Sequence, residues 1–203
     1  MQSFACGRSV TPPVRLSQRF CTLFAILPVD LVIIGVLLLI VVLVVTVIYG
    51  LIVRVPYVPT PIPVARAMVD LARLRGNERV FDLGAGNARI LIEAKKKFPS
   101  LIATGIELAP TVWLLGRFKI FLSRQNIQFL RRNAHAVDMR DAETIFLYLY
   151  PGVMERLEPK FDRELRPGTV VISHAFRFPR RQPVEVRQIG NGKWKKTILR
   201  YEW

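Results

Sequence analysis

The stretch that decides the fold is Val80-Phe81-Asp82-Leu83-Gly84-Ala85-Gly86-Asn87-Ala88-Arg89-Ile90. It is typical of a short apolar strand that ends at an acid, turns through two glycines and begins a helix at Ala88. Glycines let the backbone turn tightly and approach a ligand closely, and the free N–H groups at a helix start face that ligand. The stretch therefore predicts a strand, a loop and a helix that together bind a nucleotide.

Charge indicates which nucleotide this loop prefers. A dinucleotide site has the pattern G-x-G-x-x-G/A, whereas here Arg89 occupies the third small position and Asp82 precedes the glycines. A carboxylate repels a pyrophosphate and attracts a ligand that carries an ammonium and a sulfonium. S-adenosylmethionine is such a ligand.

A second acid follows at the expected distance. The segment Leu101–Ile106 reads as the next strand and ends at Glu107, roughly 20 residues beyond the loop, where an acid reaches ribose hydroxyls. An acid before G-x-G, with another acid after the next strand, resembles the class I methyltransferases. The alternative is a glycine turn in an unrelated α/β domain, with Glu107 as a surface acid.

Composition limits the remaining possibilities. The 203 residues are enough for one α/β domain and an attachment. Three Arg and one Asp precede residue 54, which leaves 27 basic and 14 acidic residues, a net charge of +13, in 54–203. Cys6 and Cys21 precede the domain, so a disulfide framework is excluded, and no Cys/His cluster predicts a metal site. We expect His135 and His174 to be surface or strand residues.

The chain divides into four parts. Residues 1–29 are basic and free of acids up to Val29, which suits either the flank of a membrane anchor or an organelle-targeting peptide. Residues 30–53 are almost wholly Leu, Ile and Val, and a helix of this length reaches about 35 Å, enough to cross a bilayer. A cleaved signal peptide is disfavoured because the apolar run is too long. Residues 54–63 form a Pro-rich linker, and 64–203 form the catalytic domain.

The linker has two interpretations. Its prolines hold it extended, so it can serve simply as a rigid spacer. Alternatively, Tyr57 to Pro61 forms a lip over the cofactor site. The basic residues near the two ends of the apolar run are balanced, so charge does not set its orientation. Because S-adenosylmethionine is made inside cells, we expect the domain to face the cytoplasm, or the matrix of an organelle.

Hydrophobic periodicity predicts alternating helices and strands across the domain. Pro110–Leu122 reads as a helix with a basic side at Arg117, Lys119 and Arg124, and Gly190-Asn191-Gly192 predicts a hairpin. The fold class is therefore a doubly wound, Rossmann-like α/β sheet with an antiparallel C-terminal hairpin, preceded by one transmembrane helix. The predicted helices are 64–73, 88–98, 110–122 and 153–165, and the predicted strands are 80–82, 101–107, 127–130, 144–150, 169–178, 184–189 and 194–201.

Several segments resemble the membrane-associated protein-lysine methyltransferases that modify the adenine nucleotide translocase and the ATP synthase c-subunit. They are R-V-P-Y-V-P-T-P (54–61), D-L-G-A-G-N-A-R-I (82–90), G-I-E-L-A-P (105–110), L-Y-P-G-V-M-E-R-L-E-P-K-F-D-R-E-L (149–165) and H-A-F-R-F-P (174–179). The resemblance implies that S-adenosylmethionine is the cofactor and that the acceptor is a lysine of a membrane protein. One departure is that Asn87-Ala88 stands where the family usually has Asp-Gly.

The resemblance also implies site residues. Asp82, Gly84 and Gly86 would line the methionine part of the cofactor, and Glu107 would hold the ribose. Asn133 stands where many such enzymes have an acid near the adenine, with Asp138 as its competitor.

The acceptor side of the site is predicted from the fourth strand, which ends in Tyr148, Tyr150 and Pro151. The carboxyl ends of strands are where α/β sheets bind ligands. We expect Tyr148 to pack in the core, and Tyr150 with Pro151 to border the reacting groups, where Tyr150 orients the acceptor amine.

Three function classes remain open. They are a membrane-anchored protein-lysine methyltransferase, a methyltransferase for a lipid or small membrane-soluble molecule, and a tethered binding module that no longer holds the cofactor well. The basic groups are solvated or face anionic lipid headgroups, and no aromatic-interleaved basic pattern favours nucleic acid.

Overall fold

The computed structural model describes residues 29–53, 57–192 and 195–203. Within the first helix the side chains at position 30, position 46 and positions 49–53 are not described. The chain divides into two compact units, Met1–Ile48 and Tyr49–Trp203. The predicted roles of residues 1–28, including Cys6 and Cys21, fall outside the described residues.

Helix α2 (Val29–Val53) forms where the membrane span was expected. Its described side chains are exposed and almost all are Leu, Ile or Val. The described residues contain no helix that is both long enough and apolar enough to cross a membrane. In α2 the described side chains form an unbroken run only over 31–45. A helix at 30–53 is therefore confirmed, whereas the predicted membrane span is not supported.

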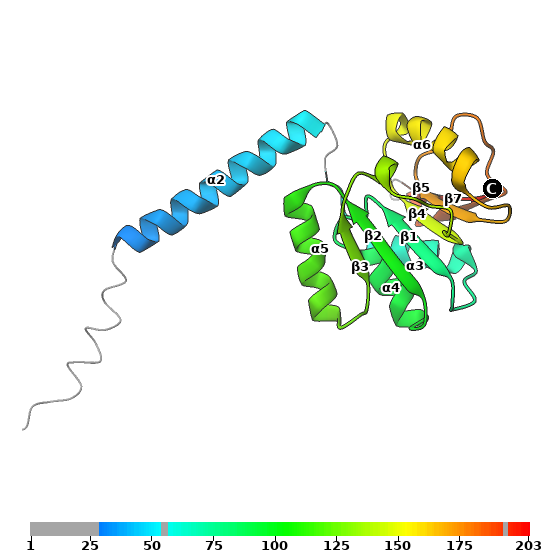
Figure 1. The fold of residues 1–203 in the computed structure, drawn as a ribbon, viewed down its shortest axis with the longest axis horizontal. Helices are drawn as coiled ribbons and strands as arrows, with labels where there is room; N and C mark the ends of the chain where they lie inside the picture. Colours follow the sequence, from blue (N-terminus) through cyan, green and yellow to red (C-terminus); the bar gives the residue numbers. More distant parts are fainter. Residues whose placement is uncertain (1–28, 54–56, 193–194) are drawn as a thin grey trace, which may run out of the picture. The chain divides into compact units, whose positions relative to one another are not determined.

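The second unit is built on one seven-stranded sheet with the order β3-β2-β1-β4-β5-β7-β6 (Figure 1). Strands β1 to β5 are parallel, and β7 runs antiparallel to both β5 and β6. This confirms the predicted doubly wound sheet with an antiparallel C-terminal hairpin. The strands are β1 (Arg79–Leu83), β2 (Ile102–Glu107), β3 (Gln128–Arg131), β4 (Thr144–Leu147), β5 (Val170–His174), β6 (Glu185–Ile189) and β7 (Lys196–Glu202).

Helices cover both faces of this sheet, as Figure 1 shows. On one face the core contains side chains of α3 (Ile62–Ala72), α4 (Arg89–Lys97) and α5 (Pro110–Ser123). On the other face it contains side chains of α6 (Pro151–Glu164) together with Phe178 and Tyr201. A short 3₁₀ helix, η1 (Ala134–Ala136), follows β3 and was not predicted. The central strands are thus buried on both sides, as parallel strands require.

Two strands are shorter than predicted. Strand β4 ends at Leu147 rather than Tyr150, because its pairing with β1 and β5 stops at Leu147, and helix α6 already begins at Pro151. Strand β5 ends at His174 rather than Phe178, since Ala175 has a left-handed backbone (φ 68°) that interrupts the pairing with β7. Both strands end early at the carboxyl edge of the sheet, so the aromatic residues that follow them lie outside the strands at this edge.

Candidate active site

The glycine loop between β1 and α4 needs glycine at two positions. Gly84 (φ 70°) and Gly86 (φ 57°) both have left-handed backbones. A Cβ atom at Gly84 would lie 2.7 Å from Leu149, and one at Gly86 would lie 2.9 Å from the ring of Tyr57. Ala88 at the helix start also has φ 59°, although it is not glycine. The loop is therefore a tight turn that accepts no larger residue at Gly84 or Gly86 without displacement.

Asp82 is the buried acid of the site. Its side chain is on β1, the residue is 1% exposed, and Oδ2 has no hydrogen-bond partner among the described residues. Burial, and then the nearby charge of Glu107, raises the pKa of Asp82 to about 8. A buried carboxylate without a partner is costly, and a cationic ligand would supply the missing partner.

Glu107 lies at the end of β2, beside Asp82. Asp82 pairs with Gly105 across the two parallel strands, so Glu107, two residues further on, is on the same side of the sheet as Asp82. Its carboxylate is held by backbone donors: Oε2 accepts the N–H of Gly86 at 3.0 Å and Oε1 accepts the N–H of Ala109 at 2.9 Å. The glycine loop and the second acid are therefore joined directly.

A pocket of about 410 Å³ opens next to Glu107, at the carboxyl ends of β2 and β3. Asn133 lines it, and the Asn133 side chain also accepts the N–H of His135 at 3.0 Å, which fixes the start of η1. The other residues that line it are Leu108, Pro110, Arg131 and Arg132.

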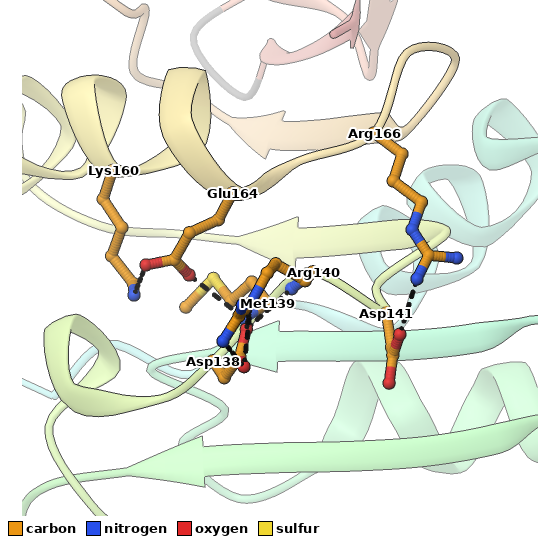
Figure 2. A network of polar contacts seen from close by, with 7 residues as sticks. All are labelled: Asp138, Met139, Arg140, Asp141, Lys160, Glu164 and Arg166. Carbon is orange, nitrogen blue, oxygen red and sulfur yellow. Dashed lines mark hydrogen bonds and ion pairs between the residues drawn. The ribbon is translucent and has the colours of Figure 1, made fainter.

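Asp138 does not line this pocket. Its carboxylate accepts from the guanidinium of Arg140 at 2.6 Å, and this ion pair holds the pKa of Asp138 at about 2 (Figure 2). Figure 2 also shows the neighbouring Glu164, which pairs with Lys160 and accepts the N–H of Met139 at 3.1 Å. Of the two residues considered from the sequence, Asn133 is therefore the one that the structure brings to the pocket.

Tyr57 lies over the glycine loop. Its ring occupies the space beside Gly86, and burial raises the pKa of the Tyr57 hydroxyl, with the charges of Arg89 and Glu107 also acting on it. The guanidinium of Arg89 donates to the carbonyl oxygen of Thr60 at 2.5 Å and fastens the segment to α4. The Pro-rich segment is thus more than a spacer, since it contacts the loop as the lip hypothesis expects.

An aromatic cluster lies at the ends of β4 and β5. The ring centres of Tyr148 and His174 are 4.1 Å apart, and those of Tyr150 and Phe176 are 5.6 Å apart. Tyr148 is only partly buried, so the expectation that it packs in the core is wrong. The residue between the tyrosines, Leu149, contacts Gly84, and the cluster therefore borders the glycine loop.

His174 also belongs to this cluster, although the sequence did not indicate a role for it in the site. It is 1% exposed, and neither ring nitrogen has a partner among the described residues. Burial, and then the charge of Lys196, lowers the pKa of His174 to about 4, so the imidazole is neutral at pH 7. It was expected to be a surface or strand residue, and it is indeed the last residue of β5. The sequence feature that could have indicated a role in the site is a histidine in a predicted strand, two residues before Phe176.

Pro151 opens helix α6 and is exposed. This position explains the proline by backbone geometry alone, because proline suits the first turn of a helix. In the described part of the chain, no three His, Cys, Asp or Glu side chains gather as metal ligands would.

Comparison with known proteins adds a family to this geometry. The family model described as the ANTKMT methyltransferase domain matches residues 82–185. A protein-lysine N-methyltransferase of Saccharolobus islandicus is 34% identical over 157 residues, which are 73% of this chain and 93% of that protein. The adenine nucleotide translocase lysine N-methyltransferase of Mus musculus is 33% identical over 68% of this chain. This chain covers 60% of that mouse protein, and 61% of the human lysine N-methyltransferase named for the ATP synthase c-subunit.

Solved structures share the fold. An RNA methyltransferase from Salinibacter ruber, in complex with S-adenosyl-L-homocysteine, has a TM-score of 0.65 and 31% identity, and the match covers 71% of this chain and 93% of that one. A precorrin-6y C5,15-methyltransferase from Geobacter metallireducens has a TM-score of 0.59 at 22% identity, covering 73% of this chain and 91% of that one.

Proposed function

The chain belongs to the ANTKMT methyltransferase-domain family, and on that premise we propose that it transfers methyl groups from S-adenosylmethionine to a lysine side chain of a membrane-associated protein. The observation that carries the proposal is the buried carboxyl group of Asp82 beside Glu107 and the glycine loop, because its Oδ2 has no hydrogen-bond partner in the described part of the chain. Such a site suits a cationic methyl donor and disfavours a phosphate.

The donor half of the site fits this cofactor. Asp82, Gly84 and Gly86 would hold its methionine part, Glu107 its ribose and Asn133 its adenine. When bound, S-adenosylmethionine supplies an electrophilic methyl group on a sulfonium. The contribution of these residues is to fix the position of the donor and to exclude water, since methyl transfer needs alignment more than acid-base chemistry.

The acceptor half is proposed to be the aromatic cluster of Tyr148, Tyr150, His174 and Phe176. A lysine amine must lose its proton before it reacts, and a water-poor, apolar setting lowers its pKa from about 10.4. A neutral His174 adds no positive charge that would repel the incoming ammonium. We assign Tyr150 the role of orienting the amine through its hydroxyl or ring, with Pro151 fixing the backbone beside it.

The membrane part of the proposal rests on two observations. The two animal relatives are named for the adenine nucleotide translocase and the ATP synthase c-subunit. The described side chains of α2 present an exposed apolar surface. We propose that α2 attaches the protein to a membrane and that the catalytic domain lies on the side where the cofactor is made, in the cytoplasm or an organelle matrix. Alkaline carbonate extraction tests this, because an attached protein stays with the membrane fraction.

Transfer of label tests the enzymatic part. Full-length protein is incubated with membranes and S-adenosylmethionine labelled on its methyl group, and protein is then separated from lipid. We expect label on lysine, identified by mass spectrometry of the protein fraction, and none with Asp82→Asn. Label in the lipid fraction would instead identify a lipid methyltransferase, and failure to bind the cofactor in calorimetry would identify a binding module.

A further inference from the structure

Helix α5 presents its apolar side to solvent. Four large side chains on it are between 58% and 77% exposed: Leu114, Phe118, Phe121 and Leu122. The residues that face the sheet are Gly116 and Ile120, both buried. Because a helix turns about 100° per residue, Phe118 points roughly opposite to the middle of this buried side, and the other three lie around it. We call these four residues the α5 outer face.

Two cations flank the α5 outer face. Arg117 lies on one side of Phe118 and Lys119 on the other, at about 100° in each direction around the helix. Arg117 also lies over the ring of Trp113, at 5.4 Å from its centre. An apolar stripe bordered by cations suits contact with a bilayer surface, where apolar side chains can enter the boundary below the headgroups and cations can meet anionic headgroups.

The charges around α5 are also uncompensated. Residues 108–137 contain no Asp or Glu and five basic residues, namely Arg117, Lys119, Arg124, Arg131 and Arg132. None of the five forms an ion pair within the described residues, whereas Lys96 and Lys97 of α4 pair with Glu93 and Asp70. The region therefore offers free positive charge next to exposed apolar side chains.

We propose that the α5 outer face docks on the surface of an anionic lipid bilayer. The Phe and Leu side chains enter the boundary between headgroups and acyl chains, and Arg117 and Lys119 meet the anionic headgroups. A protein partner would have to match a helix that carries only positive charge, while a bilayer surface supplies both the apolar layer and the negative charge. The proposal is independent of the methyl acceptor and of α2.

Docking would also orient the active site. Gly116 allows α5 to approach the glycine loop so closely that a Cβ there would lie 2.8 Å from the carbonyl oxygen of Gly86. Arg131 and Arg132, which line the pocket, belong to the same acid-free region. A protein bound through α5 therefore holds the glycine loop and the pocket at a fixed height above the bilayer.

A local fluorescence probe tests this without interference from α2. Full-length protein with Cys6→Ser and Cys21→Ser receives one new cysteine, Phe121→Cys on α5 or Val186→Cys on exposed strand β6, labelled with a polarity-sensitive dye. With vesicles of phosphatidylcholine and phosphatidylglycerol, we expect a blue shift of emission at position 121 and none at position 186. Vesicles of phosphatidylcholine alone should give a much smaller shift at 121. Leu114→Cys is a second position should the first variant fold poorly, as judged by circular dichroism.

Charge removal sharpens the test. With Arg117→Gln and Lys119→Gln added, the anionic lipid concentration needed for half of the shift should rise roughly tenfold or more. Equal shifts at 121 and 186, or no shift at 121, would overturn the proposal. Blue-shifted emission at position 121 before vesicles are added would also overturn the proposal. If that emission depends on protein concentration, a second copy of the chain covers the α5 outer face. If it does not, α2 covers this face.

Discussion

The two halves of the proposed active site are built in different ways. The proposed donor half consists of Asp82, the glycine loop and Glu107, which lie within 26 residues of sequence and bring two carboxyl groups together. The proposed acceptor half consists of aromatic residues at the ends of two strands and is neutral, with His174 uncharged at pH 7. In this proposal the carboxyl groups hold the donor, while an apolar surface receives the amine. Variants of the two halves should therefore fail in different ways.

The largest effect should come from Asp82→Ala. Removing the carboxylate takes away the partner of a buried cationic group, so we expect cofactor affinity to fall by roughly a hundredfold or more. Calorimetric titration measures this. Asp138→Asn is the matched control, because Asp138 is exposed and paired with Arg140. The affinity of this variant for the cofactor should be unchanged. Equal losses in both variants would remove the special role of Asp82.

The next effect is a pH dependence that only the donor half should have. Because the pKa of Asp82 is raised to about 8, the free protein must release a proton to bind a cation below that pH. Affinity should therefore rise by up to about tenfold per pH unit between roughly pH 6 and 7.5. In Asp82→Asn the cofactor affinity should not depend on pH in this range. An unchanged slope in this variant would mean that another group causes the pH dependence.

The raised pKa of Asp82 and the lowered pKa of His174 make opposite predictions for how the free energy of unfolding depends on pH. The folded protein binds more protons than the unfolded chain between the ordinary pKa of Asp82, 3.8, and about 8, so Asp82 lowers stability as pH rises through that window. The unfolded chain binds more protons at His174 between 6.5 and about 4, so His174 lowers stability as pH falls there. Urea unfolding at several pH values measures both effects. Asp82→Asn should remove the loss of stability with rising pH, and His174→Phe should remove the loss of stability with falling pH.

A smaller effect is expected in the acceptor half. Tyr150→Phe and Tyr150→Ala should lower kcat, by roughly tenfold for the alanine variant, and leave cofactor affinity unchanged. Steady-state kinetics of label transfer from S-adenosylmethionine to membranes measures kcat, and calorimetry measures the cofactor affinity. Full turnover in both variants, with folding intact, would remove Tyr150 from the mechanism.

The smallest effect concerns Ala88. Its left-handed backbone is strained for any residue with a Cβ atom, so Ala88→Gly should raise the free energy of unfolding by about 1 kcal/mol or less. The gain is partly offset because the buried methyl group is lost. Chemical unfolding measures it, and a clear loss of stability would show that packing of the methyl outweighs the strain.

The sequence predicted the sheet well because its apolar runs and turns are regular, whereas the pairing of Asp82 with Gly105 is seen only in the structure. It predicted less at the carboxyl edge, where Ala175 and Pro151 end the strands through backbone geometry rather than hydrophobicity. For α5 it predicted a basic side. The helix is apolar almost all round, and only packing against the sheet reveals which apolar residues remain exposed.

The sequence offered contacts between distant segments only as alternatives, and the structure was needed to choose between them. Nothing in the local pattern distinguishes Asn133 from Asp138, and only the ion pair with Arg140 and the position of the pocket do so. In the same way, the ring of Tyr57 meets Gly86 across 29 residues of sequence.

The proposed function depends on the selection of a cationic methyl donor by the buried carboxyl group of Asp82. This selection can be measured by calorimetry of the protein and of Asp82→Asn, each titrated with S-adenosylmethionine and separately with a nicotinamide dinucleotide at pH 7.5. We expect the original protein to bind only the methyl donor and the variant to lose this binding. Binding of the dinucleotide, or undiminished binding of S-adenosylmethionine by the variant, would contradict it.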